Sequence, residues 1–165
     1  MILETDSRIN KKMKKCDDDD DELAEIVEGK LFLGSIRHGE DLERLRQMGI
    51  THLLNVTQQP TPPKVRAAVR EVLDMPLVDC SDAEAAMLAA FDPSSGFIEA
   101  AIGEGGACLV FCLMGASRSP AIVTAYLMRS RGMRAAEALE LVRQRRPATD
   151  PNHGFLRGLA TWESS

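Results

Sequence analysis

Apolar and polar residues follow one another along this chain in a pattern that predicts strands and helices in turn. Short apolar runs bounded by turn residues predict strands at 50–56, 72–78 and 107–112, after a hairpin at 25–34. Apolar positions at helical spacing predict helices at 41–48, 64–69, 83–91, 94–104, 120–131 and 135–146, and a last helix carrying Leu156, Leu159 and Trp162. This order predicts an α/β fold, with helices on both faces of a central, mostly parallel sheet.

One predicted strand contains a proline. Pro76 lies within 72–78 and cannot donate a sheet hydrogen bond, so we expect this strand near an edge of the sheet. Asp79 and Asp82 follow it. Asn55 ends the strand at 50–56, and we expect it to order neighbouring loops rather than to contact a ligand.

The first 23 residues differ in composition from the rest. Residues 11–15 hold four lysines, and residues 17–22 are all acidic. Adjacent blocks of opposite charge with little apolar content cannot bury a core. We therefore expect a disordered charged tail at 1–23 and one folded domain at 24–163. A nuclear-localisation or docking role for the lysines is the alternative to a merely solvated tail.

The stretch from Cys112 to Ser119 combines a nucleophile with a predicted anion site. Cys112 ends an apolar strand, and a tight loop leads to Arg118 at the start of the next helix. Such a loop turns its backbone N–H groups inward, and the helix dipole adds partial positive charge. The guanidinium of Arg118 can bind two phosphate oxygens, and the same field favours the thiolate of Cys112. The expected phosphate-binding residues are Leu113, Met114, Gly115, Ala116, Ser117 and Arg118.

Two further residues of this stretch have predicted tasks. Gly115 permits a backbone conformation that a side chain would obstruct. Ser119 can donate its hydroxyl to the sulfur of Cys112 and help that sulfur to leave. The set is suited to phosphoryl transfer through a cysteinyl-phosphate.

Composition excludes several classes of function. The chain is 44% hydrophobic and 27% charged, as in ordinary globular proteins. A net charge of −5 and an aromatic content of 4% argue against broad nucleic-acid or anionic-membrane binding. No apolar stretch approaches the roughly 20 residues of a membrane span. The four cysteines have neither disulfide nor zinc spacing, so we expect reduced thiols, with Cys108 in the core.

The spacing Cys-x5-Arg-Ser over 112–119 resembles the signature loop of cysteine-dependent phosphatases. With Ala-Tyr-Leu-Met at 125–128 after it, the stretch resembles dual-specificity protein phosphatases in particular. Similar matches are Leu-Phe-Leu-Gly at 31–34, Leu-Asn-Val-Thr at 54–57 and the Arg-Pro…Pro-Asn-x-Gly-Phe run at 146–155. The resemblance covers about 24–163. It implies an atypical, catalytic-domain-only enzyme that hydrolyses phosphoserine, phosphothreonine and phosphotyrosine in proteins.

The resemblance also implies catalytic roles. Cys112 would attack phosphorus, Arg118 and the loop amides would hold the phosphate oxygens, and Ser119 would assist the sulfur. The family's general acid follows a Pro-x-x-Asp pattern, which ends at Asp79 here. Asp82 remains the alternative acid, because the segment that follows is slightly longer than usual. The resemblance implies neither a metal nor a cofactor.

Two residues depart from the family pattern. Phe111 stands where the family has a histidine that hydrogen-bonds and orders the loop, and Met114 stands where a small residue is usual. These departures predict weak activity. They also motivate one alternative, a phosphate-binding pseudophosphatase or scaffold. The other alternative is a phosphatase of phosphoinositides, glycans or RNA, which the uncharged residues Leu113, Met114 and Ala116 disfavour.

The remaining expectations concern the surface and the partners. The arginines at 143, 145 and 146 are expected to form a solvated, charged helix end rather than phosphopeptide or nucleic-acid contacts, and His153 is expected at the surface rather than as a base. The expected partner is a phosphoprotein substrate, with no nucleic acid and no membrane. The expected compartment is the cytoplasm, with the nucleus as the alternative.

Overall fold

A computed structural model of the chain describes residues 21–165. The lysine block at 11–15 and most of the predicted tail at 1–23 lie outside the described residues. The described residues form a five-stranded sheet in the order β1-β2-β5-β3-β4. Only β1 pairs antiparallel with its neighbour, so the expected mostly parallel sheet is confirmed. The strands are β1 Ala24–Val27, β2 Leu31–Ser35, β3 His52–Asn55, β4 Glu71–Asp74 and β5 Cys108–Cys112.

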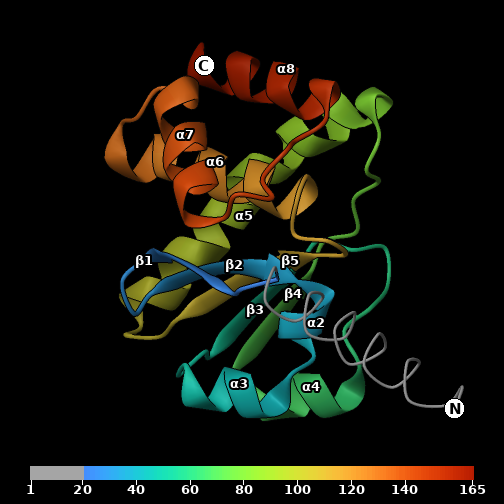
Figure 1. The fold of residues 1–165 in the computed structure, drawn as a ribbon, viewed down its shortest axis with the longest axis vertical. Helices are drawn as coiled ribbons and strands as arrows, with labels where there is room; N and C mark the ends of the chain where they lie inside the picture. Colours follow the sequence, from blue (N-terminus) through green and yellow to red (C-terminus); the bar gives the residue numbers. More distant parts are fainter. Residues whose placement is uncertain (1–20) are drawn as a thin grey trace, which may run out of the picture.

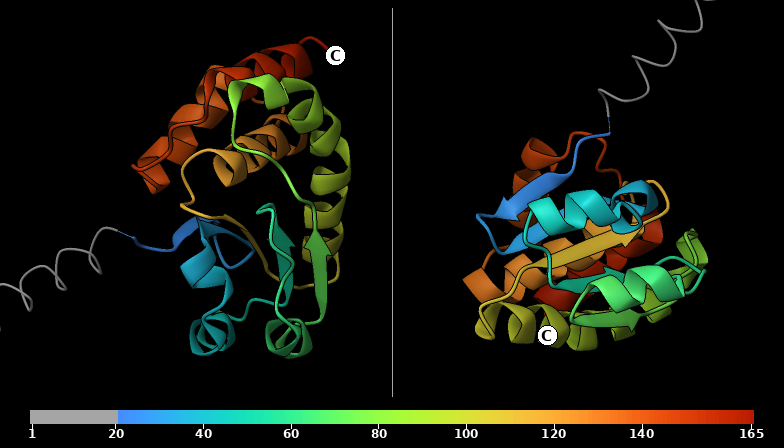
Figure 2. Two further views of the ribbon diagram at one scale, coloured as in Figure 1. Left: turned by 90° about the vertical axis from the view of Figure 1, so that its right-hand side faces the viewer. Right: turned by 90° about the horizontal axis from the view of Figure 1, so that it is seen from below.

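Helices cover both faces of this sheet, as expected (Figures 1 and 2). One face carries the short helices α2 Ile36–Gly39, α3 Leu42–Gln47 and α4 Pro63–Ala68. The other carries α5 Glu84–Gly103, α6 Arg118–Arg131, α7 Ala135–Arg145 and α8 His153–Glu163, after a 3-10 turn, η1, at Ser81–Ala83. No helix within residues 21–165 is long and apolar enough to cross a membrane.

Alternation along β5 directs its side chains to two separate cores. Cys108, Val110 and Cys112 belong to the larger core beneath α5–α8, whereas Leu109 and Phe111 belong to the smaller core beneath α3 and α4. Successive side chains of a strand point to opposite faces of the sheet. The thiol of Cys112 and the ring of Phe111 therefore lie on opposite faces.

The observed β4 is shorter than the strand predicted there. The strand predicted at 72–78 ends at Asp74, because Met75 makes the last backbone hydrogen bond to β3 and Pro76 has no N–H to continue the ladder. Its expected position at the sheet edge is confirmed.

The two helices predicted at 83–91 and 94–104 are one helix, α5, with Pro93 inside it. The hydroxyl of Ser94, the residue after the proline, donates to the carbonyl of Phe91 at 3.1 Å. Phe91, Ser94 and Ile98 are buried against neighbouring helices. This burial outweighs the local preference of proline for a helix end.

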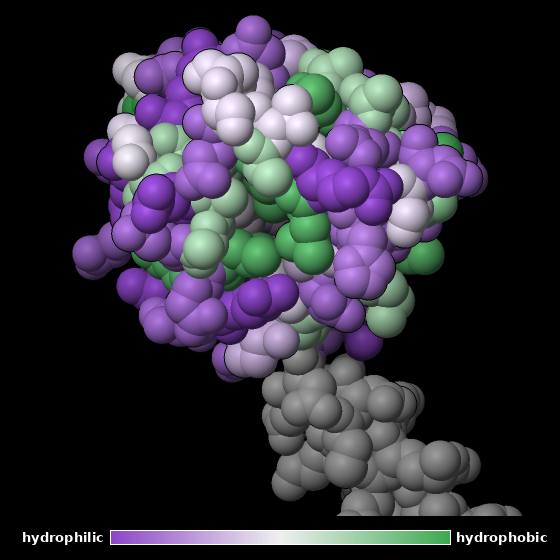
Figure 3. Space-filling view, turned by 90° about the horizontal axis from the view of Figure 1, so that it is seen from above, coloured by the Kyte–Doolittle hydropathy of each residue, from purple (hydrophilic) through white to green (hydrophobic). Residues whose placement is uncertain are grey.

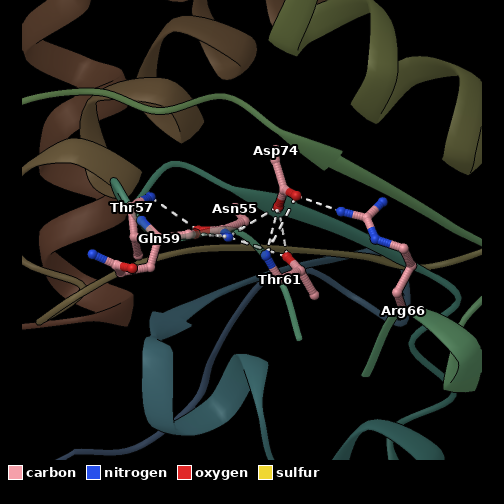
Figure 4. Close-up of polar contacts among 6 residues, drawn as sticks. All are labelled: Asn55, Thr57, Gln59, Thr61, Arg66 and Asp74. Atoms are coloured by element: carbon pink, nitrogen blue, oxygen red, sulfur yellow. Dashed lines mark hydrogen bonds and ion pairs between the residues drawn. The ribbon is translucent and has the colours of Figure 1, made fainter. Parts of the chain in front are cut away.

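Asn55 orders the loop after β3, as expected (Figure 4). Its amide nitrogen donates to Gln59 O and to Asp74 Oδ1, and its amide oxygen accepts from the backbone and the hydroxyl of Thr57. Asp74 also accepts from the hydroxyl of Thr61 and pairs with Arg66. Burial raises the pKa of Asp74, but these hydrogen bonds outweigh it and hold the pKa below its ordinary value. The network fixes residues 55–61 at the carboxyl edge of the sheet.

Phe111 packs directly over Gly39 of α2. A Cβ atom at Gly39 would lie 2.6 Å from two ring atoms of Phe111, which is closer than carbon atoms approach in proteins. The glycine is thus needed for space and matches the bulky ring opposite it.

We predict that Gly39→Ala destabilises the protein by about 1–3 kcal/mol, because the ring and the helix must move apart. Gly96→Ala is the matched control: Gly96 lies inside α5 with nothing within 4 Å of the new methyl group, and we expect a gain of about 0.5–1 kcal/mol there. Urea unfolding measures both. The double variant Gly39→Ala/Phe111→Leu should recover part of the loss. Equal stability of Gly39→Ala and the parent would contradict the packing argument.

Candidate active site

The connection between β5 and α6 is a tight loop that starts at Cys112 and ends at Arg118. Gly115 has φ 66°, a conformation that side chains disfavour, as the sequence led us to expect. A Cβ atom there would also lie 2.6 Å from the carbonyl oxygen of Gly34 and 2.5 Å from Nη2 of Arg146. Both the conformation and the close approach require glycine.

Four consecutive carbonyl groups of this loop accept hydrogen bonds from groups outside it. The donors come from three separate places in the chain: the start of α2, the end of α7 and the segment before α8. The pairs are Ile36 N to Leu113 O at 3.3 Å, Arg146 Nη2 to Met114 O at 3.0 Å, Arg146 Nε to Gly115 O at 2.8 Å, and Asp150 N to Ala116 O at 2.6 Å.

The amide N–H groups of the loop therefore point the other way. In a trans peptide the C=O and the following N–H lie on opposite sides of the bond, and no cis peptide occurs in residues 21–165. Within that part of the chain, the N–H groups of residues 114–117 donate no hydrogen bond. A row of unpaired N–H groups at the N-terminus of a long helix is an anion-binding arrangement.

Cys112 lies at the base of this loop and is 2% exposed. Its Sγ is 3.0 Å from the hydroxyl oxygen of Ser119, which is also 3.4 Å from Gly34 O. The other thiol of β5, Cys108, is fully buried as expected, and burial raises its pKa far above the ordinary range. Of the two thiols of β5, Cys112 is the one that combines a strand-end position with a hydroxyl partner and the loop amides.

Arg118 connects the loop to the segment that follows β4. Its Nη1 donates to Leu77 O at 3.1 Å, and its side chain is buried. Its Nε is buried as well and has no partner among the described residues. A buried, unpaired N–H of a guanidinium can still donate to a ligand oxygen.

Asp79 is joined to the loop by a second connection, through Asn152. The amide nitrogen of Asn152 donates to Asp79 Oδ1 at 2.9 Å, and its backbone N–H donates to the hydroxyl of Ser117 at 3.0 Å. Its side-chain oxygen caps α8 by accepting from Phe155 N. Asp82 lies in η1, and no hydrogen bond within residues 21–165 joins it to the loop. The sequence analysis did not predict that Asn152 connects Asp79 to the loop.

Arg146 was expected in a solvated helix end, and that expectation is wrong. Arg143 and Arg145 are exposed, but Arg146 is 4% exposed and holds two loop carbonyls. A signal was present: Arg146 is four residues after the buried Val142 and thus continues the apolar stripe of α7. His153 is exposed, as expected.

The rim of the site is apolar. Leu113 and Met114 of the loop are 53% and 70% exposed, and Val78, next to Asp79, is 48% exposed. Seen from above, the side on which α8 lies in Figure 1, the molecule shows apolar side chains gathered around a hollow with hydrophilic ones around them (Figure 3).

Comparison with known proteins places this arrangement in a family. Residues 31–165 match the model of the dual specificity phosphatase catalytic domain. Dual specificity phosphatase 28 of Homo sapiens is 40% identical over 139 residues, which cover 84% of this chain and 77% of that protein. Dual specificity protein phosphatase 1B of Arabidopsis thaliana is 41% identical over 144 residues, covering 87% and 83%.

Solved structures agree. The crystal structure of human DUSP28 has a TM-score of 0.77 and 39% identity, and covers 86% of this chain and 93% of that one. A mouse putative dual specificity phosphatase complexed with zinc tungstate has a TM-score of 0.78 and 37% identity, with 86% of both chains covered. The chain therefore belongs to the dual specificity phosphatases, a family of protein phosphatase enzymes, and carries their catalytic domain.

Proposed function

We propose that the chain hydrolyses phosphoserine, phosphothreonine and phosphotyrosine in proteins through a cysteinyl-phosphate on Cys112. The observation that carries this proposal is the row of inward N–H groups at residues 114–117, held above a strand-end thiol by outward carbonyls. Three phosphate oxygens can bind these donors and the guanidinium of Arg118 while phosphorus faces Cys112 Sγ.

The reaction has two steps. In the first, the thiolate of Cys112 forms an S–P bond as the P–O bond to the substrate breaks, and Asp79 gives its proton to the leaving oxygen. In the second, water attacks phosphorus, Asp79 takes a proton from that water, and the S–P bond breaks. Ser119 donates a hydrogen bond to the departing sulfur. The N–H groups and Arg118 stabilise the charge on the equatorial oxygens in both steps.

Two observations favour Asp79 over Asp82 as the acid. Asn152 joins Asp79 to Ser117 of the loop, and Arg118 holds the same segment through Leu77 O. Both contacts bring the residues around Asp79 to the phosphate site. Asp82 has no comparable connection within residues 21–165.

The apolar rim supports a protein substrate over a phosphoinositide. A polyanionic headgroup needs cationic neighbours around its phosphates, whereas Leu113, Met114 and Val78 present apolar surface. Apolar residues on either side of a phosphorylated residue can pack there. A pseudophosphatase is the second candidate, because the bulky Met114 stands at the rim, 70% exposed, and Phe111 supplies no hydrogen bond.

We predict that Cys112→Ser and Arg118→Ala each abolish turnover of phosphopeptides and of an aryl phosphate, while circular dichroism and thermal unfolding show a retained fold. Cys112→Ser should still bind inorganic phosphate, because its amides remain. Rapid quenching of the parent, followed by mass analysis of the Cys112 peptide, should find one added phosphoryl group. Parent-like turnover by purified Cys112→Ser would refute the cysteine mechanism. Phosphate binding without any turnover by the parent would favour the pseudophosphatase.

The acid assignment predicts unequal effects at the two aspartates. Asp79→Ala should slow hydrolysis of an alkyl phosphate by about 10²–10⁴-fold and that of an aryl phosphate with a good leaving group far less. Asp82→Ala is the matched control and should change both rates little. Steady-state rates of the parent and both variants on the alkyl and the aryl phosphate measure these effects. The reverse order of effects would assign the acid to Asp82.

Phe111→His tests how far the missing histidine limits the enzyme. The ring lies on the sheet face opposite the thiol, so a histidine could act only through the backbone of the loop. We predict that Phe111→His moves the midpoint of iodoacetate alkylation of Cys112 to lower pH and speeds turnover. An unchanged or higher midpoint, with the fold intact, would mean that packing around Phe111 and Gly39 replaces the histidine.

A further inference from the structure

Arg146 is a buried cation whose acceptors come from the loop after β5 and from the residues just before β1. It donates to Met114 O and Gly115 O of the loop at 112–118, here called the phosphate loop. It also donates through Nη1 to Glu22 O at 2.6 Å and through Nη2 to Asp21 Oδ1 at 2.7 Å. Three of these acceptors are neutral carbonyls. Asp21 is the carboxylate that pairs with the guanidinium.

A buried guanidinium needs such a partner. Removing one member of a buried pair leaves an uncompensated charge, which is strongly unfavourable. Burial raises the pKa of Asp21, but the hydrogen bonds from Arg146 and Ser35 outweigh it and hold the pKa below its ordinary value. Asp21 is therefore ionised at neutral pH and supplies the countercharge.

Asp21 is itself fixed by the end of β2. The hydroxyl of Ser35 donates to Asp21 Oδ2 at 2.7 Å, and Ser35 pairs directly with Cys112 in the sheet. The N–H of Ser35 donates to Nδ1 of His38 at 3.0 Å, so Nε2 carries the proton and donates to Asp21 O at 2.9 Å. Burial lowers the pKa of His38, which favours this neutral form. Asp21, the last aspartate of the acidic run at 17–22, is thus anchored beside the strand that carries Cys112.

We propose that Asp21 and Arg146 form a positioning pair for the phosphate loop. Asp21 holds the guanidinium in place, and the guanidinium turns the carbonyls of Met114 and Gly115 outward so that the following amides face the phosphate. The inference rests on the proposed phosphate site. It makes the end of the charged N-terminal segment part of the catalytic apparatus rather than a tail.

The proposal can be separated from a simple charge effect, because the two predict opposite signs. If Asp21 acted only through its negative charge, removing it would strengthen phosphate binding and favour the thiolate of Cys112. If Asp21 positions Arg146, removing it lets the amides lose alignment. Phosphate binding then weakens and the thiolate is disfavoured.

The test uses the full chain with Asp21→Ala, Asp21→Asn and the control Asp92→Asn, which breaks the exposed Asp92–Arg129 pair between α5 and α6. Calorimetric titration with inorganic phosphate and the pH midpoint of iodoacetate alkylation are measured well below the unfolding temperature of every variant. We expect Asp21→Ala to weaken phosphate binding about tenfold, the size of one lost charge-assisted hydrogen bond, and to raise the midpoint. Asp21→Asn, which can still accept from Arg146, should fall between Asp21→Ala and the parent. Asp92→Asn should match the parent.

Unchanged or tighter phosphate binding by Asp21→Ala would overturn the positioning role. That outcome is distinct from failure of the proposed function, in which the parent itself would neither bind phosphate nor turn over any phosphomonoester. If the parent and Asp21→Ala bound phosphate and hydrolysed phosphomonoesters equally well, the positioning role of Asp21 would be wrong and the phosphatase mechanism would be unaffected.

Discussion

Hydrogen bonds from outside the loop keep the carbonyls of residues 113–116 pointing outward, and the rest of this site depends on that constraint. An unconstrained loop can adopt many conformations, and in most of them its amide N–H groups point in different directions. Here Ile36, Arg146 and Asp150 bind the carbonyls from outside, and trans peptide geometry directs the amides to the other side. These donors are far apart in the sequence, so this arrangement of the amides exists only in the folded chain.

A second set of contacts joins the phosphate loop to the segment that carries Asp79. Arg118 reaches Leu77 O, and Asn152 bridges Ser117 and Asp79. The side chain of Arg118 contacts a backbone carbonyl of that segment, and the side chain of Asn152 contacts the carboxylate of Asp79. The proposed nucleophile, the loop amides and the proposed acid are therefore held by hydrogen bonds that converge on one loop, and Asp21 joins them through Arg146.

Local patterns in the sequence predicted what depends on local chemistry. The strand, loop and helix around Cys112, the role of Gly115 and the contact of Ser119 all follow from residues close together in the chain. The apolar stripe of α7 gave a local signal for the burial of Arg146, but local patterns could not predict its pairing with Asp21, which lies more than 120 positions away. The single helix α5 depends on packing that outweighs Pro93. Strand alternation alone places the Phe111 side chain on the sheet face away from the thiol. Its contact with Gly39 depends on tertiary packing and could not be predicted from the sequence.

Amide nuclear magnetic resonance of ¹⁵N-labelled protein can detect the proposed binding of phosphate at the amides of residues 114–117 one residue at a time. Inorganic phosphate should shift these four N–H signals downfield together, with one shared saturation curve, because N–H groups that gain a charged acceptor are deshielded. The Cys112→Ser protein should show the same four shifts. If phosphate shifted the signals of other amides to saturation while these four stayed unchanged, the loop would not be the phosphate site.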